Sequence, residues 1–285
     1  THGTEKAVHR EKRENQMNKR TVIALASCAG FASAALAGDP VFEIADGNSS
    51  ATFDSAQGQV NWLVDGVNQL FRQEFYFRRS TDTREYRMDA TNLNNLGNFT
   101  QDTNPFSDDR DDAFGSLFSD GAGLEYETLF TIRGNAAGSG AAALAEQITI
   151  RNMSNAAISL SFFQFVNFDL GGDFSDDFGQ IVNGNTALQS DDDFSMSEVV
   201  VTPAPIAFQM GNGVTMRSML NDNAIDNLDG TDSFSGDVGW AFQWDITLAA
   251  GDSFLISKNK QVVPAPGAMM LLGTAGLVAS RRRRS

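Results

Sequence analysis

The stretch Val238-Gly-Trp-Ala-Phe-Gln-Trp-Asp-Ile-Thr-Leu248 alternates large apolar side chains with small or polar ones at almost every step. Successive side chains of a β-strand point to opposite faces, so this period of two predicts a strand that buries Trp240, Phe242 and Trp244 on one face. Such alternation is typical of antiparallel sheets with one buried and one solvated face. Similar alternation recurs in the segments 67–78, 124–132 and 158–168.

Turn signals separate these apolar runs. Asn183-Gly184 is a candidate for a type I′ hairpin turn, and only Gly138 to Ala145 looks helix-prone, with a Gly/Ala-rich loop as the alternative. In the segment 67–78, Gln69 and Gln73 are polar exceptions on the apolar side. About 10 to 14 strands with little helix predict an all-β fold, an antiparallel β-sandwich of jelly-roll type.

The front of the chain has the pattern of a secretory leader. Lys19 and Arg20 precede an apolar run over 21–35, and Ala35-Leu36-Ala37 forms a small-x-small cleavage site before Gly38. We therefore expect a signal helix and signal peptide at 17–37, with the mature chain starting near Gly38. A plausible initiator appears only at Met17, so we interpret residues 1–16 as an upstream translation artefact.

This processing changes the composition of the predicted body. Both histidines, His2 and His9, and the single cysteine, Cys28, lie in the part removed. The mature chain then excludes Cys–His and Ser–His–Asp nucleophilic sites, the usual zinc ligand sets and disulfides. Three of the 36 acidic residues and ten of the 21 basic ones lie in the segment before Gly38 or in the final arginine block. The body therefore has 33 acidic and 11 basic residues and a net charge of −22. Nucleic acid is therefore not an expected partner.

The last 23 residues combine three features in a fixed order. Val263-Pro-Ala-Pro266 is followed by an uncharged run from Gly267 to Ala279 and by four arginines, Arg281, Arg282, Arg283 and Arg284. The apolar run predicts a short helix of roughly 20 Å, less than the ~30 Å of a bilayer core, and the four arginines predict a cytoplasmic stop. We assign 262–285 to this tail and 38–261 to the β-sandwich domain.

This tail resembles the C-terminal sorting signal of the PEP-CTERM family, which has a Val-Pro-Glu-Pro motif, an apolar helix and an Arg-rich end. Val263, Pro264 and Pro266 match the motif, whereas Ala265 stands at the glutamate position, so the resemblance indicates a variant subfamily. It implies the secretion machinery and an exosortase-like membrane enzyme as partners. It also implies transient anchoring in the inner membrane before delivery to the cell surface or an extracellular polysaccharide matrix. An uncleaved membrane anchor is the alternative.

The body itself is similar to a group of uncharacterised secreted proteins that carry the same tail, on segments such as Phe168-Asp-Leu-Gly-Gly172 and Trp240-Ala-Phe-Gln-Trp244. That similarity implies one compact domain and brings no activity with it.

Acidic loops are the main candidates for chemistry. Carboxylates suit calcium, so a calcium site is the metal hypothesis and solvated turn residues are the alternative. The first-choice ligands for calcium are Asp169, Asp173, Asp176 and Asp177. A glycosidase would need two carboxylates across a cleft, and the glutamates considered are Glu74, Glu125, Glu127, Glu146 and Glu198.

Three tryptophans and two lysines complete the set of candidates. Trp62, Trp240 and Trp244 would form a carbohydrate platform if exposed, although the parity of Trp240 and Trp244 favours the core. Lys258 and Lys260 are the only lysines of the mature body, and we expect them on a solvated strand edge where the body gives way to a linker.

These patterns predict an exported, non-enzymatic surface or matrix protein with no catalytic residues. A carbohydrate-binding module with calcium dependence is the first alternative, and an enzyme is the second.

Overall fold

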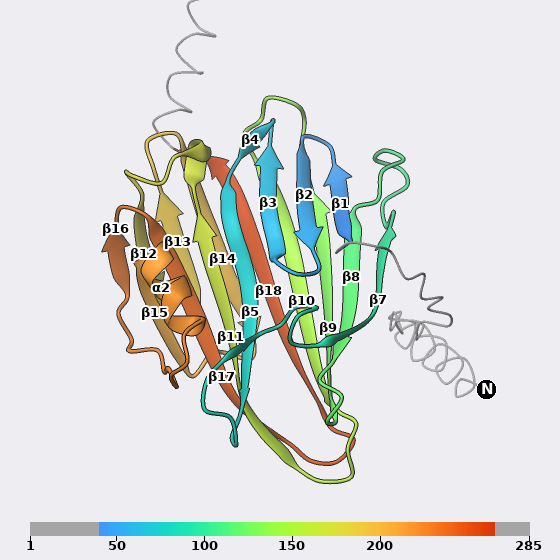
Figure 1. The fold of residues 1–285 in the computed structure, drawn as a ribbon. Coiled ribbons are helices and arrows are strands. Elements are labelled where there is room, and N and C mark those ends of the chain that lie inside the picture. Colours follow the sequence, from blue (N-terminus) through green and yellow to red (C-terminus); the bar gives the residue numbers. More distant parts are fainter. Residues whose placement is uncertain (1–39, 266–285) are drawn as a thin grey trace, which may run out of the picture. The chain divides into compact units, whose positions relative to one another are not determined.

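The computed structural model describes residues 40–265, which form two antiparallel β-sheets packed face to face (Figure 1). The predicted all-β sandwich is confirmed. The expected signal helix and C-terminal helix lie outside the described residues.

Seven strands form the main path of the first sheet, sheet A. From edge to edge they are β1 (Val41–Asp46), β2 (Ser49–Asp54), β3 (Gly58–Val64), β5 (Leu70–Arg79), β11 (Ile158–Phe168), β17 (Val238–Leu248) and β15 (Ala207–Asn212). Two short strands extend it: β4 (Val67–Asn68) pairs with β3, and β6 (Tyr86–Arg87) pairs with β5.

Nine strands form sheet B. From edge to edge they are β16 (Ser233–Ser235), β12 (Phe178–Val182), β13 (Thr186–Ser190), β14 (Phe194–Thr202), β18 (Ser253–Pro264), β10 (Ala142–Asn152), β9 (Leu124–Arg133), β8 (Ala113–Ser119) and β7 (Asn94–Gln101). Runs of consecutive strands, β1 to β3 in sheet A and β7 to β10 and β12 to β14 in sheet B, are joined by pairs of strands that are distant in sequence. A short 3₁₀ helix, η1 (Leu170–Gly172), lies on the crossover from β11 to β12.

Aromatic side chains from the two sheets meet in the core between them. Phe53 of β2 lies 4.5 Å, between ring centroids, from Phe130 of β9, and Phe162 of β11 lies 6.4 Å from Tyr126 of β9. Pairs in this distance range add to the stabilisation that burial of their area already gives. The predicted inward face of β17 is confirmed, since Trp240, Phe242 and Trp244 are all buried.

The outer face of sheet A is also covered, which the alternation did not predict. The helix α2 (Gly213–Leu220) packs Met216 and Leu220 against Tyr76, Phe163 and Phe165 of sheet A. Asn212 caps this helix by accepting a hydrogen bond from the backbone N–H of Thr215 at 3.0 Å. Both faces of β11 and β17 are therefore buried along most of their length.

Two local predictions have different outcomes. Asn183 and Gly184 both adopt positive φ, 55° and 71°, as the predicted type I′ turn between β12 and β13 requires. The segment 138–145 is not helical: from Ala142 onward it belongs to β10, which pairs with β9 and β18 over its whole length. Pairing on both sides satisfies the backbone of this alanine-rich segment as a strand.

Candidate functional site

Lys258 and Lys260 lie in the core between the sheets, and the prediction of a solvated strand edge is wrong. The two residues are 0% and 2% exposed, because β18 is a central strand between β14 and β10. They share the inward face of β18 with Ile256 and Val262, which are also buried. The segment expected to be a linker is thus the middle of sheet B.

Two buried glutamates of sheet B neutralise these lysines. Lys258 Nζ lies 3.0 Å from Glu146 Oε1 and 3.2 Å from Glu198 Oε1, and Lys260 Nζ lies 2.9 Å from Glu146 Oε2. Burial favours the neutral acid, but the ammonium groups of Lys258 and Lys260 more than offset it and hold the pKa of Glu146 below its usual value. Burial lowers the pKa of Lys258, against the opposing effect of the two glutamates.

Polar side chains of sheet A complete this buried network. Gln73 Nε2 donates to Glu146 Oε1 at 2.8 Å, and Gln164 Nε2 donates to Glu198 Oε1 at 2.7 Å. Trp240 Nε1 donates to Glu198 Oε2 at 2.8 Å. Gln73, the polar exception in the sequence pattern, is therefore a partner for a charge on the opposite sheet. We call Gln73, Glu146, Gln164, Glu198, Lys258 and Lys260 the buried network.

The buried network corrects the hypothesis of a glycosidase carboxylate pair. Glu146 and Glu198 do come together, but around two lysines and with almost no solvent exposure, so they do not face each other across a cleft. Glu74 lies on the outer face of sheet A, where the Arg217 guanidinium binds it through two contacts of 2.7 and 2.8 Å. Glu125 and Glu127 lie on the outward-facing positions of β9.

The predicted calcium ligands separate into exposed and buried carboxylates. Asp173 and Asp176 are exposed, and Asp173 accepts hydrogen bonds from the N–H and the hydroxyl of Ser175 as an ordinary turn residue does. Asp177 is only 1% exposed, and neither of its carboxylate oxygens accepts a hydrogen bond. Asp169 is half-buried.

Burial and mutual repulsion perturb these acids. Burial raises the pKa of Asp177 to about 8, against the opposing effect of the Gln189 side chain, and the nearby carboxylates of Asp191, Asp176 and Asp169 add to the rise. Burial also raises the pKa of Asp169 to about 6, with Asp237 and Asp173 adding to the shift, and it raises that of Asp191. Among residues 40–265 no group of three or more acidic, histidine or cysteine side chains is arranged to hold a metal ion. We call Asp169, Asp177 and Asp191 the acidic end.

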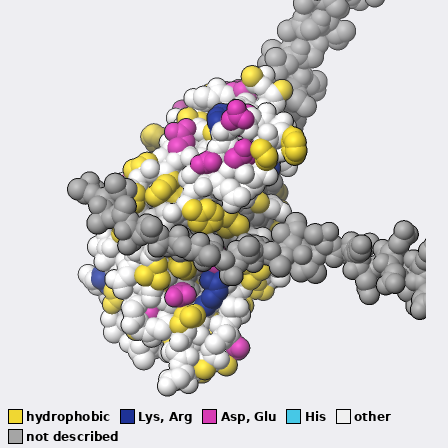
Figure 2. Space-filling view, turned by 90° about the vertical axis from the view of Figure 1, so that its right-hand side faces the viewer, with side chains coloured by type: hydrophobic (Ala, Val, Ile, Leu, Met, Phe, Trp, Pro, Cys, Tyr) yellow, Lys and Arg dark blue, Asp and Glu magenta, His cyan; other side chains and the backbone are white. Residues whose placement is uncertain are grey.

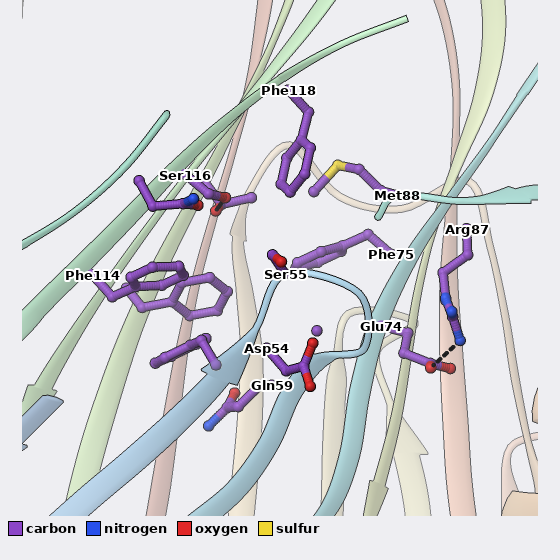
Figure 3. Close-up of a pocket in the computed structure, with 15 residues that line it drawn as sticks. Asp54, Ser55, Gln59, Glu74, Phe75, Arg87, Met88, Phe114, Ser116 and Phe118 are labelled. Carbon is purple, nitrogen blue, oxygen red and sulfur yellow. Dashed lines mark hydrogen bonds and ion pairs between the residues drawn. The ribbon is translucent and has the colours of Figure 1, made fainter. Parts of the chain in front are cut away.

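A small internal cavity of about 40 Å³ lies near the turn between β2 and β3 (Figure 3). Phenylalanines of both sheets line it, and Ser55 Oγ, Gln59 Oε1 and Asn98 Oδ1 on its wall have no hydrogen-bond partner. The volume suits a few water molecules and is far below the roughly 300 Å³ at which small-molecule sites begin. The unpaired oxygens point to bound water.

A larger groove of about 410 Å³ lies on the outer face of sheet A, over one end of β5, β11 and β17. Most of the residues that line it carry a hydroxyl, carboxylate or guanidinium group, although apolar atoms contribute more of its surface; they are Arg78, Arg79, Ser80, Asp82, Ser159, Leu160, Ser161, Ile225, Asp245, Ile246 and Thr247. Ser161 Oγ donates to Asp245 Oδ1 at 2.7 Å, and the hydroxyls of Ser159 and Thr247 lie 2.9 Å apart. We call this feature the outer groove.

The tryptophans do not form a carbohydrate platform. Trp62, Trp240 and Trp244 are at most 1% exposed, and each indole N–H has an acceptor inside the protein. Acidic side chains lie among polar and hydrophobic ones on the face shown in Figure 2. Among residues 40–265 a sugar site therefore has no exposed tryptophan on which to stack a ring.

The first residues of the predicted sorting motif belong to the fold. Val263 and Pro264 end β18 and pair with Ser195 and Phe194 of β14, while the N–H of Ala265 donates to Asp193 O at 2.7 Å. Ala265 is 6% exposed, so this part of the motif is buried against the sandwich.

The remaining residues of the two predicted targeting signals are not part of the described structure. The predicted signal-cleavage residues Ala35, Ala37 and Gly38 precede residue 40, and the last proline of the motif, Pro266, follows residue 265. The predicted cytoplasmic stop also lies outside the described residues, and it consists of Arg281, Arg282, Arg283 and Arg284. Within 40–265 there is no helix of the length and apolarity needed to cross a bilayer.

Comparisons with known proteins find similarity in fold. No family model and no curated protein matches the chain. A bacterial glucoamylase, solved as a complex with acarbose, matches 86% of this chain at 10% identity with a TM-score of 0.54, and the match spans 36% of the glucoamylase. A putative aldose 1-epimerase from Escherichia coli K12 matches at 10% identity with a TM-score of 0.49, and the match covers 80% of this chain and 100% of the epimerase. A galactose mutarotase-like protein from Lactobacillus casei matches at 10% identity with a TM-score of 0.46, and the match covers 79% of this chain and 100% of that protein.

These comparisons correct the expectation of a non-enzymatic protein. One solved structure with this fold is named as a glucoamylase, so a sandwich of this kind does not argue against catalysis. At 10% identity the glucoamylase match shows the fold alone, and the chain spans about a third of that protein's length.

Proposed function

We propose that this is an exported carbohydrate-binding protein and that it holds its glycan in the outer groove. The observation that carries the proposal is the groove itself, which is about 410 Å³ in volume and includes hydroxyl, carboxylate and guanidinium groups that can exchange hydrogen bonds with sugar hydroxyls. Its volume lies in the range of small-molecule sites, unlike that of the internal cavity. The fold shared with a glucoamylase supports the carbohydrate class.

The arrangement of donors and acceptors favours polyols. Arg78 Nη2 donates to Ser161 Oγ at 3.2 Å, and Ser161 in turn donates to Asp245, so a guanidinium, a hydroxyl and a carboxylate stand in a row. Asp82 accepts a hydrogen bond from the backbone N–H of Arg79 at 2.7 Å. Neighbouring hydroxyls of a sugar bind well to such alternating acceptors and donors.

Binding to a panel of oligosaccharides and extracellular polysaccharides, measured by calorimetry and affinity electrophoresis, tests this proposal. Replacing Asp245 with Ala removes a charged acceptor, which should weaken binding roughly 10- to 100-fold. Asn259→Ala is the matched control, because Asn259 lines a groove of about 340 Å³ on the opposite outer face, that of sheet B. Equal losses in both variants, or no binding by the unchanged protein, would contradict the proposal. Product analysis of the same mixtures reports any turnover of the bound glycan.

Delivery to the cell surface or matrix is the second part of the proposal, and it rests on the resemblance of the tail to the PEP-CTERM signal. Because β18 ends at Pro264 and Ala265 bonds to Asp193, a chain truncated after Ala265 keeps every described element. We expect the full chain to pass through the membrane fraction and to lose its terminal arginines, and the truncated chain to bypass that stage. Cell fractionation with intact-mass measurement checks this, and retention of Arg284 in the final product favours a permanent anchor.

A calcium ion at the acidic end is a second candidate function. The supporting observation is that Asp177, almost fully buried, presents two oxygens without partners among other carboxylates. The carboxylate we propose as a ligand is Asp177, in place of the exposed Asp173 and Asp176, because no three carboxylates among residues 40–265 are arranged to hold an ion. Calcium takes six to eight oxygen ligands in proteins, so backbone carbonyls and water would have to complete the shell.

A further inference from the structure

The buried network holds an amine, a primary amide and a carboxylate in mutual contact. Lys260 Nζ donates a hydrogen bond to Gln73 Oε1, so the amine contacts the amide group of Gln73. Glu146 contacts both partners: its Oε2 accepts from Lys260 Nζ at 2.9 Å and its Oε1 accepts from Gln73 Nε2 at 2.8 Å. The three side chains come from β18, β5 and β10, so they span both sheets.

We propose that Lys260 and Gln73 form an intramolecular isopeptide bond, with Glu146 as the group that moves the protons. Lys260 first passes a proton from its ammonium group to Glu146 Oε2, which yields a neutral amine and a carboxylic acid. The amine then attacks Gln73 Cδ, so that an Nζ–Cδ bond forms as the carbonyl electron pair moves to Oε1. Glu146 relays the protons to Nε2, the Cδ–Nε2 bond breaks, and ammonia leaves. Amine and primary amide become secondary amide and ammonia, with no oxidant or external reactant.

The surroundings suit this step for two reasons. All three residues are at most 2% exposed, so water does not compete for the amide carbon. Holding the reacting groups in contact also replaces an encounter step by a positioned one.

The other half of the buried network serves as an internal comparison. Gln164 donates to Glu198, and Lys258 contacts Glu198, so the same three residue types are present. However, Gln164 Oε1 has no hydrogen-bond partner, so Lys258 does not approach that amide carbonyl as Lys260 approaches Gln73. The bond is therefore expected at one of the two Lys–Gln pairs only.

Intact-mass measurement of the purified, denatured protein tests the proposal. The measured mass should be lower, by one ammonia, than the mass calculated from the sequence between the observed termini. Digestion should yield a branched peptide that joins the segments containing residues 73 and 260. Gln73→Met should restore the full mass, and so should Glu146→Gln. Gln164→Met is the matched control and should keep the deficit.

Several outcomes would overturn the inference. If the protein without substitutions has the full calculated mass, the inference is wrong, whether or not the variants fold. A deficit that maps to another site, such as an Asn-Gly succinimide, also overturns it. Formation of the branched peptide in Glu146→Gln would overturn the role given to Glu146. Denaturing electrophoresis gives a second readout, because a bond across 187 residues of chain should make the unchanged protein migrate faster than Gln73→Met.

Discussion

The buried network and the acidic end place carboxylates inside the same sandwich in opposite ways. In the buried network two glutamates face two lysines, and amide and indole groups of sheet A bond to the remaining oxygens. At the acidic end Asp177 is also buried, yet its oxygens have no partner, and its charged neighbours are further carboxylates. The pKa of Glu146 is lowered, whereas that of Asp177 is raised.

The difference shows that burial alone does not decide the protonation state of an acid in this core. Desolvation acts on both groups in the same direction, and the sign of the neighbouring charges reverses the outcome. Within the described residues the buried network pairs its own charges, two glutamates with two lysines. The acidic end is incomplete and needs a proton or a cation, which makes it the part of the core that can respond to its surroundings.

The largest expected effect comes from removing one lysine of the buried network. Lys258→Met removes the ammonium group that lies 3.0 Å from Glu146 and 3.2 Å from Glu198, and breaking a buried pair in this way costs about 3–5 kcal/mol of unfolding free energy. Chemical denaturation at neutral pH measures it. The double variant Lys258→Met with Glu198→Gln removes the uncompensated charge and should recover a substantial part of the loss. If the single variant loses less than the double variant, the pairing does not stabilise the core.

An intermediate effect is expected from pH at the acidic end. Between the ordinary aspartate pKa of 3.8 and about 8, the folded protein keeps a proton on Asp177 that the unfolded chain has released. Its contribution to the free energy of unfolding is therefore fully present below 3.8 and is lost as the pH rises toward 8. Asp177→Asn should remove this slope and stabilise the protein by about 1–3 kcal/mol at pH 8. Denaturant curves at pH 5 and pH 8 test it, and an unchanged slope in the variant would assign the titration elsewhere.

Calcium should act on the same carboxylates in the opposite sense. At pH 8 the ionised Asp177 can bind a cation, and a ligand that binds only the folded state at about tenfold its Kd stabilises by roughly 1.4 kcal/mol. We expect the melting temperature of the unchanged protein to rise with calcium and fall with chelator, while that of Asp177→Asn responds to neither. An equal response in both proteins would place the ion at another site, and no response would remove calcium from the proposal.

The sequence contains a sign that Lys258 and Lys260 are buried, although we predict a solvated edge for them. Lys258 and Lys260 have the same parity as Ile256 and Val262, which predicts an inward face, yet a charged pair near the end of the domain favoured an exposed edge. The missing information was the partner: Glu146 precedes Lys260 by 114 residues, and periodicity does not reveal which strands pair. The same limitation concealed Gln73, whose polar side chain on an apolar face made sense only opposite Glu146.

The helix α2 and the outer groove could not have been predicted either. Gly213-Val-Thr at the start of α2 contains poor helix formers, and the helix is stabilised by packing Met216 and Leu220 on sheet A rather than by propensity. The outer groove joins residues from strands far apart in the chain. The face of β17 and the Asn183-Gly184 turn were predicted correctly because each depends on local pattern alone.

The smallest expected effect separates two aspartates that the sequence treated alike. Asp173 and Asp177 belong to one acidic run, but Asp177 has the parity of the buried Gly179 and Ile181, whereas Asp173 is exposed and bonds only to Ser175 in its own turn. Asp173→Ala should change the unfolding free energy by less than about 0.5 kcal/mol and leave its pH slope intact, as surface substitutions usually do. Denaturation at pH 5 and pH 8 beside Asp177→Asn provides the comparison. A change in slope on removing Asp173 would mean that the run acts as one charged cluster, so that burial of a single member is not what distinguishes the acidic end from the buried network.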